Sequence, residues 1–136
     1  MSTKLDLIPA NTKMESNGHG ESFDISSSGS RTFLCLLTVA DQLEQESLDV
    51  SIYGSADGTT WTPKPVLKMP QQFYRGHTKM VLDLSLRKEI KFIRARWELN
   101  RWGRGAPLAM FVAGLELTEV PQMSRETPGR SAVAAR

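Results

Sequence analysis

The feature that most constrains the fold of this chain is a strand pattern that runs directly into a tight turn, in residues 47–61 (SLDVSIYGSADGTTW). Every second residue there is apolar (Leu48, Val50 and Ile52), and the residues between them are polar or aromatic. A period of two is typical of a strand with one buried face. Gly58 can adopt the positive φ that a tight turn requires, and Trp61 is expected to begin the returning strand. The segment therefore predicts a β-hairpin against which further strands pack.

Further strands are predicted by the same alternation in residues 79–86, 91–99 and 108–120. Residues 32–39 (TFLCLLTV) are apolar on both faces, which predicts a central, covered strand. The expected inner-face residues are Met80, Leu82, Leu84, Leu86, Ile93, Ala95, Trp97, Leu99, Phe111, Ala113, Leu115 and Leu117. Many short strands with almost no helical periodicity predict an all-β fold, an antiparallel β-sandwich or jelly roll.

The two ends of the chain differ in character from its middle. Residues 1–20 are mostly polar, although Leu5, Leu7 and Ile8 would also suit a short edge strand. Residues 121–136 (PQMSRETPGRSAVAAR) show no sustained period. We expect an extended N-terminal arm (1–20), a β-sandwich domain (21–120) and a C-terminal tail (121–136).

Composition narrows the functional classes. The 136 residues are enough for one domain with a single core, and the net charge of +2 does not by itself indicate a nucleic acid or membrane partner. One cysteine, Cys35, excludes an internal disulfide, and with only two histidines no zinc cluster or other cofactor site is predicted. The first residues lack a signal peptide and no apolar stretch approaches the roughly 20 residues that span a bilayer. We expect cytoplasmic synthesis, with a virion or other particle as one destination.

Three motifs carry a resemblance to a known family. They are the Ser-x-Asp-Gly-x-x-Trp turn (Ser55, Asp57, Gly58, Trp61), the aromatic-Ile-Arg strand (Phe92, Ile93, Arg94) and the closing Leu-x-Leu (Leu115, Leu117). In this order they resemble the C-terminal half of discoidin-like jelly rolls, the galactose-binding-like C-type domains of coagulation factors. The pattern is also similar to small β-sandwich proteins of tailed-phage particles and to uncharacterised bacterial proteins. The disulfide usual in the discoidin-like family cannot form here, which weakens a secreted, glycan-binding interpretation.

Two loops are the candidate binding sites. In residues 100–107 (NRWGRGAP), Trp102 stands between Arg101 and Arg104 in a glycine-rich stretch. Its ring would either stack on a sugar, a base or a partner's side chain, or fold back and cap the sandwich. The second loop carries Phe73, Tyr74, Arg75 and His77, a composition enriched in interfaces, with one of its two aromatic residues expected to plug the core.

A basic strip over residues 91–104, which runs into the Trp102 loop, raises the question of nucleic acid binding. Five cations (Lys91, Arg94, Arg96, Arg101, Arg104) against Glu98 give a local charge of +4. Alternation turns Trp97 inward and the arginines outward, so they do not form one stacking platform and nucleic acid is not the expected partner. The simpler alternative is pairing of the arginines with Asp83, Glu116 or Glu119 on neighbouring strands.

No catalytic signature is present. His77 has no nucleophile beside it, and no carboxylates lie at a catalytic spacing. Asp57 is interpreted as a turn residue, because one carboxylate falls far short of a calcium site. We therefore expect a non-enzymatic structural or interaction subunit that self-associates or joins other subunits, its arm and tail lying across neighbours. A carbohydrate-binding module using Trp102, Tyr74 and the nearby arginines is the alternative.

Overall fold

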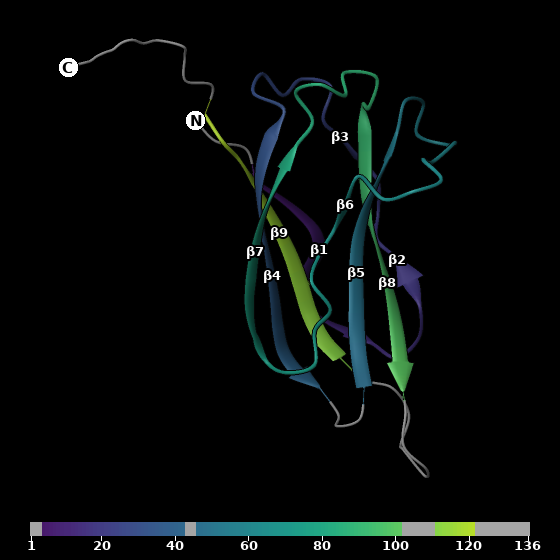
Figure 1. Ribbon diagram of the computed structural model, residues 1–136, viewed down its shortest axis with the longest axis vertical. Coiled ribbons are helices and arrows are strands. Elements are labelled where there is room, and N and C mark those ends of the chain that lie inside the picture. The colour runs from purple at the N-terminus through teal and green to yellow at the C-terminus, as the bar shows by residue number, and fades with distance from the viewer. Residues whose placement is uncertain (1–3, 43–45, 102–110, 122–136) are drawn as a thin grey trace, which may run out of the picture.

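The computed structural model describes residues 4–42, 46–101 and 111–121, which form two antiparallel sheets packed face to face (Figure 1). The strands are β1 (Lys4–Met14), β2 (Gly18–His19), β3 (Phe23–Asp24), β4 (Thr32–Gln42), β5 (Glu46–Ser55), β6 (Leu67–Lys68), β7 (Gly76–Asp83), β8 (Phe92–Arg101) and β9 (Phe111–Glu119). The described part of the chain contains no helix, and hence none that is long and apolar enough to cross a membrane. The predicted all-β antiparallel sandwich is confirmed.

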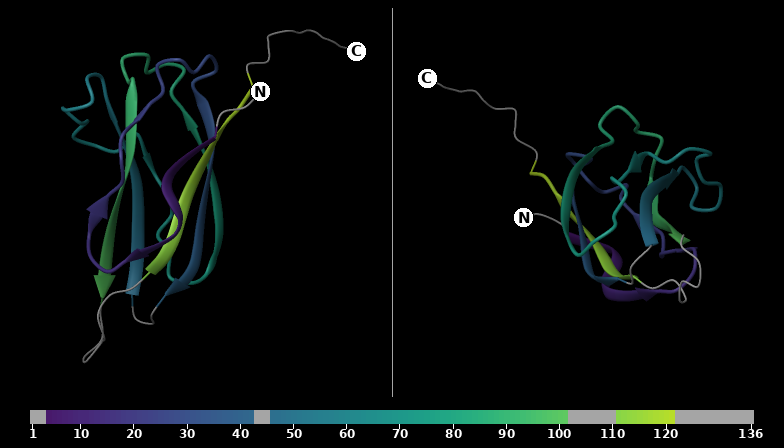
Figure 2. Two further views of the ribbon diagram at one scale, coloured as in Figure 1. Left: turned by 180° about the vertical axis from the view of Figure 1, so that it is seen from behind. Right: turned by 60° about the horizontal axis from the view of Figure 1, so that its bottom comes forward.

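The two sheets are built from strands that are far apart in the sequence. One sheet has the order β1-β9-β4-β7, and the other has the order β2-β8-β5-β6 with β3 also pairing with β8. Figure 1 and the left view of Figure 2 show the long strands running side by side along the length of the molecule. Every strand pairing in the two sheets is antiparallel.

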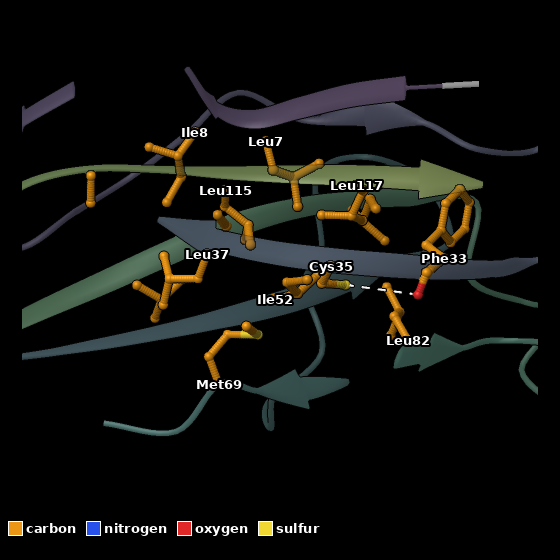
Figure 3. Close-up of a cluster of buried hydrophobic side chains, with 14 of the residues drawn as sticks. Leu7, Ile8, Phe33, Cys35, Leu37, Ile52, Met69, Leu82, Leu115 and Leu117 are labelled. Atoms are coloured by element: carbon orange, nitrogen blue, oxygen red, sulfur yellow. Dashed lines mark hydrogen bonds between the residues drawn. The ribbon is translucent and has the colours of Figure 1, made fainter. Parts of the chain in front are cut away.

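The core lies between the sheets and consists mainly of the alternating inner residues of their long strands, with Ile25, Met69, Leu84 and Ile90 from the connections (Figure 3). The buried set includes Phe33, Cys35, Leu37, Leu48, Val50, Ile52, Leu82, Ile93, Ala95, Phe111, Ala113, Leu115 and Leu117. Residues on the inner face of a strand recur at every second position, so the alternation seen in the sequence identified most of this core. Trp97 and Leu99 pack against it while partly buried.

The hairpin predicted for residues 47–61 is only partly observed. Gly58 does adopt a positive φ, of 84°, in the turn after β5. The returning segment, however, is not a full strand, because Trp61 makes one isolated bridge with Ser55 and β6 is two residues long. The main partner of β5 is β8, which pairs with it along its whole length.

The N-terminal residues belong to the sandwich. β1 is an 11-residue strand that pairs with β9 at the edge of the first sheet and buries Leu7, Ile8 and Met14. The prediction of a separate arm over residues 1–20 is therefore wrong for the described residues, and the alternative edge strand is the observed structure. The polar sequence conceals this strand, because an edge strand can gain its backbone hydrogen bonds while presenting polar side chains to solvent. Of the predicted C-terminal tail, only Pro121 lies within the described residues.

Two further predictions about side-chain direction are wrong. Leu86 was expected on the inner face, but β7 ends at Asp83 and Leu86 is 94% exposed in the following turn. The β4 strand is central in its sheet, as predicted, yet its second face is not covered, since Leu34 is 39% exposed. Apolar composition on both faces therefore did not indicate a second covering layer.

Candidate interaction surfaces

The loop before β7 places two aromatic rings at the surface. Phe73 is 40% exposed and Tyr74 is 74% exposed, and their ring centroids lie 6.3 Å apart at an interplanar angle of 47°. The expectation that one of these rings plugs the core is therefore wrong. Arg75 is exposed beside them, whereas His77 already belongs to β7, where its Nδ1 lies 3.0 Å from the Thr38 hydroxyl. The loop thus presents two aromatic side chains and a cation to solvent.

The second candidate loop begins where the described part of β8 ends. Arg101 is the last residue of β8, and its backbone pairs with that of Glu46. The Arg101 side chain, Trp102 and Arg104 lie outside the described residues. Gln72 and Leu48 exchange two backbone hydrogen bonds of 2.9 Å, close to the Glu46 pairing, so the Phe73–Tyr74 loop lies at the same end of the sandwich as the end of β8.

Arginines of the basic strip stack on aromatic rings of their own sheet. The Arg94 guanidinium lies 4.3 Å from the centroid of the Trp61 ring, and that of Arg96 lies 5.7 Å from the centroid of Tyr53. Such cation–π contacts hold the arginines along the outer face of β5 and β8. Trp97 faces inward as predicted, and its indole Nε1 donates a hydrogen bond of 3.1 Å to the carbonyl of Ser16.

The carboxylates that were the alternative predicted partners of these arginines bond elsewhere. Glu116 lies 3.6 Å from the Lys4 ammonium, and Glu119 accepts a 2.6 Å hydrogen bond from the Ser28 hydroxyl. Asp83 accepts a 2.9 Å hydrogen bond from the backbone N–H of Ser85. The predicted pairing across strands is therefore replaced by aromatic stacking, because Asp83, Glu116 and Glu119 belong to the other sheet.

On the outer face of β5 and β8, the Asp49 carboxylate is hydrogen-bonded within the chain. Asp49 lies opposite Glu98 in the strand pairing, an arrangement of like charges. Its Oδ2 accepts hydrogen bonds from the side-chain amides of Gln71, at 3.1 Å, and Asn100, at 3.3 Å. A hollow of only about 70 Å³ remains among these polar groups. This face is polar and largely occupied by contacts within the chain.

The outer face of the β1-β9-β4-β7 sheet is different, because it exposes apolar side chains. Leu34 of β4 and Val81 of β7 lie directly opposite each other, and Val81 is 56% exposed. Beside them is a hollow of about 180 Å³ between β1, β9 and β4, lined by Ile8, Ala10, Leu36, Ala40, Gly114 and Leu115 with Asp6, Asn11, Thr38 and Glu116. This face was not predicted as an interaction surface, although the apolar residues on both sides of β4 were a signal for it.

The hairpin turn and the cysteine have structural roles. The Asp57 carboxylate accepts hydrogen bonds from the backbone N–H groups of Thr60 and Thr59 and from the Ser55 hydroxyl, which hold its pKa well below the ordinary value. Burial raises the pKa of the Cys35 thiol to about 12. No group of three or more histidine, cysteine or carboxylate side chains that could hold a metal ion occurs among the residues described.

Comparison with known proteins supports the β-sandwich fold of this chain. No family model and no curated protein sequence matches it. Among solved structures, this antiparallel β-sandwich is similar to a part of much longer chains from a virus and a subviral particle. The chain spans about a third of their length, and at 12% identity the similarity shows the fold alone.

Two of the matching structures are as follows. The first is a chain in the structure of the infectious bursal disease virus Gx strain, with a TM-score of 0.58 and 12% identity over 87% of this chain and 31% of that chain. The second is the infectious bursal disease virus VP2 subviral particle, with a TM-score of 0.49 and 12% identity over 87% of this chain and 32% of that chain. The discoidin-like resemblance stays a prediction.

Proposed function

We propose that this protein is a non-enzymatic structural subunit, a β-sandwich module that joins copies of itself or other subunits into a virion-like particle, filament or other assembly. The observation that carries the proposal is the exposed apolar pair Leu34–Val81 on the outer face of a regular sheet. Contiguous apolar surface rimmed by polar residues is a common feature of protein contact sites. The fold likeness to a chain of a virus structure agrees with such a role.

In this proposal the sandwich acts as the rigid body and the variable segments make the contacts. The Phe73–Tyr74 loop supplies exposed aromatic anchors, a side-chain type enriched at interfaces. Arg101, Trp102 and Arg104, the residues of the second candidate loop, supply a further anchor in this proposal. Residues 121–136 lie across a neighbouring subunit, where contact orders them.

Light scattering coupled to gel filtration, at several concentrations of the full chain, tests the assembly. We expect a species heavier than the 15.2 kDa monomer whose mass grows with concentration. Deleting residues 121–136 should lower that mass and leave the sandwich folded, and replacing them with a Gly-Ser segment of equal length controls for chain length. A monomer at every concentration contradicts self-assembly.

A carbohydrate-binding module is the second candidate, favoured by the exposed rings of Phe73 and Tyr74. Exposed aromatic rings provide the apolar faces on which sugars stack. A glycan array with the wild type and the Tyr74→Ala variant tests it, with Val81→Ala as a control on a different face. Binding that Tyr74→Ala abolishes and Val81→Ala retains supports the module, and an array without binding rejects it.

A further inference from the structure

β7 is a long, regular and unpaired edge of its sheet. Its eight residues pair with β4 from Thr32↔Asp83 to Val39↔Gly76 without any register shift, and no described strand pairs with its other side. Figure 1 and the left view of Figure 2 both show β7 at the margin of the sandwich. The opposite edge, β1, contains Pro9 and two register shifts, and the edges of the second sheet are strands of two residues. Only β7 among the described edge strands therefore lacks these common protections.

The backbone groups that β7 leaves free can be assigned from its pairing. Leu84 N donates to Arg31 O at 2.8 Å, just beyond the Thr32↔Asp83 pair. Hydrogen-bonded and non-hydrogen-bonded pairs alternate in an antiparallel ladder, so even-numbered residues of β7 bond to β4. The N–H and C=O groups that face the open edge are those of His77, Lys79, Val81 and Asp83. The side chains of these four residues are exposed on the outer face.

We infer that two copies of this chain pair through β7, antiparallel about a two-fold axis at Val81, and so join their four-stranded sheets into one continuous sheet. In this register Val81 lies opposite Val81 of the second copy. Lys79 of each copy lies opposite Asp83 of the other, which gives two complementary charge pairs on the outer face. The edge-facing backbone groups of both copies meet in hydrogen-bonded pairs.

Charge and apolar surface select this register over its neighbours. A two-fold axis at Lys79 would place two ammonium groups opposite each other, which is destabilising. An axis at Met80 would place Lys79 opposite Val81, leaving its charge without a carboxylate. With the axis at Val81, the Leu34–Val81 pair of each copy meets that of the other, so the apolar surface becomes one row across the joined sheet. A surface that contacts itself is what a two-fold interface requires.

The pairing rests on the proposed function, since it supplies one specific contact of the assembly. Lys79 gives it selectivity, because an edge lysine discourages pairing unless an acidic group faces it. Asp83 is available as that group, since its Oδ1 accepts hydrogen bonds from Ser85 N and the Thr32 hydroxyl while the residue remains exposed. Two signs of charge on one strand therefore allow self-pairing in one register and oppose pairing in others.

A charge-swap mixture tests the register. Lys79→Asp alone places carboxylates opposite each other, and Asp83→Lys alone places ammonium groups opposite each other, so each variant should dissociate about tenfold more readily than the wild type. Mixing the two variants restores both complementary pairs and should give a mixed dimer of wild-type strength, as measured by analytical ultracentrifugation. The double variant Lys79→Asp/Asp83→Lys should pair with itself. Failure of the mixture to recover overturns the register.

Two additional variants keep the test independent of folding defects. Val81→Lys changes a side chain that is exposed in the monomer, so its circular dichroism should match the wild type while pairing is lost. Oxidised Val81→Cys should form a covalent dimer across the two-fold axis, whereas Lys13→Cys, exposed on the opposite edge, should not. Absence of the Val81→Cys dimer, or equal cross-linking of both variants, overturns the pairing.

The outcomes separate this inference from the proposed function. A wild-type assembly that Val81→Lys and Lys79→Asp leave unchanged rejects pairing through β7 and retains the assembly role. A wild-type dimer that both substitutions disrupt, but that grows no further, retains the pairing and rejects the larger assembly. A wild-type monomer that does not cross-link through Val81→Cys rejects both.

Discussion

The two outer faces of this sandwich differ although the same alternation builds both. On the β5–β8 face, Arg94 and Arg96 stack on Trp61 and Tyr53, and Asp49 accepts hydrogen bonds from two amides. On the β4–β7 face, Leu34 and Val81 are exposed to solvent beside a hollow of about 180 Å³. The polar groups of the first face bond within the chain, and the second face exposes apolar side chains that no described residue covers.

The difference teaches where a module of this kind can make contacts. Polar groups that are already bonded within the chain gain little from a partner, because binding exchanges one set of hydrogen bonds for another. Exposed apolar groups gain from burial in proportion to the area removed from water. The β4–β7 face is therefore the stronger candidate for assembly, and the variants below test each side of the comparison.

The largest loss of stability is expected from a substitution in the core, because the core supports both sheets and therefore both outer faces. Phe33→Ala removes one of the largest buried side chains of the core shared by the two sheets, and we expect it to lower the free energy of unfolding by about 3–5 kcal/mol. Leu34→Ala, at the next residue of the same strand, affects only the exposed face and should cost less than about 1 kcal/mol. Urea denaturation followed by tryptophan fluorescence measures both values. Equal losses would contradict the assigned faces of β4.

A smaller loss of stability is expected at Gly114, where the backbones of the paired strands β1 and β9 approach each other closely. A Cβ added at Gly114 would lie 2.8 Å from the Ala10 Cα and 3.2 Å from the Ile8 carbonyl oxygen, so backbone must move to accept it. Gly114→Ala should cost about 1–3 kcal/mol and speed amide exchange in β1, as read by hydrogen exchange. Thr118→Ala, also on β9, is the control and should leave β1 protected. Unchanged exchange in Gly114→Ala would refute the close approach.

The polar face is tested by a double-mutant cycle. Trp61→Leu and Arg94→Gln remove the two partners of the 4.3 Å cation–π contact, and we expect a coupling free energy of about 0.5–1 kcal/mol between them. The same cycle with Tyr53→Leu and Arg96→Gln should give a smaller value, because that contact is 5.7 Å long. Thermal or urea unfolding supplies the energies. A coupling of zero at Trp61–Arg94 would show that the stack does not stabilise the face.

The smallest effect concerns the acid limb of the stability curve. The backbone N–H groups of Thr60 and Thr59 and the Ser55 hydroxyl lower the pKa of Asp57 in the folded state, so its contribution is full above the ordinary value of 3.8 and is lost as the pH falls below it. Asp57→Asn should therefore be less stable at neutral pH and lose less of its Tm on acidification. Thermal unfolding from pH 7 to pH 2 measures this, with Glu21→Gln as a surface control. Parallel curves for wild type and Asp57→Asn would contradict the assignment.

Most of the sandwich could be predicted from the alternation of apolar and polar residues within single segments of the sequence. Alternation identified the inner residues of β5, β8 and β9, and Gly58 marked a turn with the positive φ that was observed. The pattern failed at β1, whose polar residues give no strong period, and at Leu86, where alternation continued in the sequence after β7 had ended. Alternation shows which side chains share a face, and it carries no signal for a strand that is held by backbone pairing at an edge.

The candidate sites were predicted less well than the fold. Composition identified Phe73 and Tyr74 as interface residues but assigned one of them to the core, where neither lies. The arginines of β8 were expected to meet carboxylates, and they meet Trp61 and Tyr53. Side-chain type was informative in both cases, whereas the contacts required knowledge of which strands are neighbours.

The all-β class, the inner residues of β5, β8 and β9 and the turn at Gly58 followed from the amino-acid sequence alone, because these depend on the local period of two and on glycine's access to positive φ. Only the tertiary structure decided that β8 rather than the returning hairpin segment pairs along β5, that β1 closes one edge, and that β7 is left open. Any strand can hydrogen-bond to any other through its backbone. The choice of neighbours, and with it the exposed face, follows from packing of the whole core.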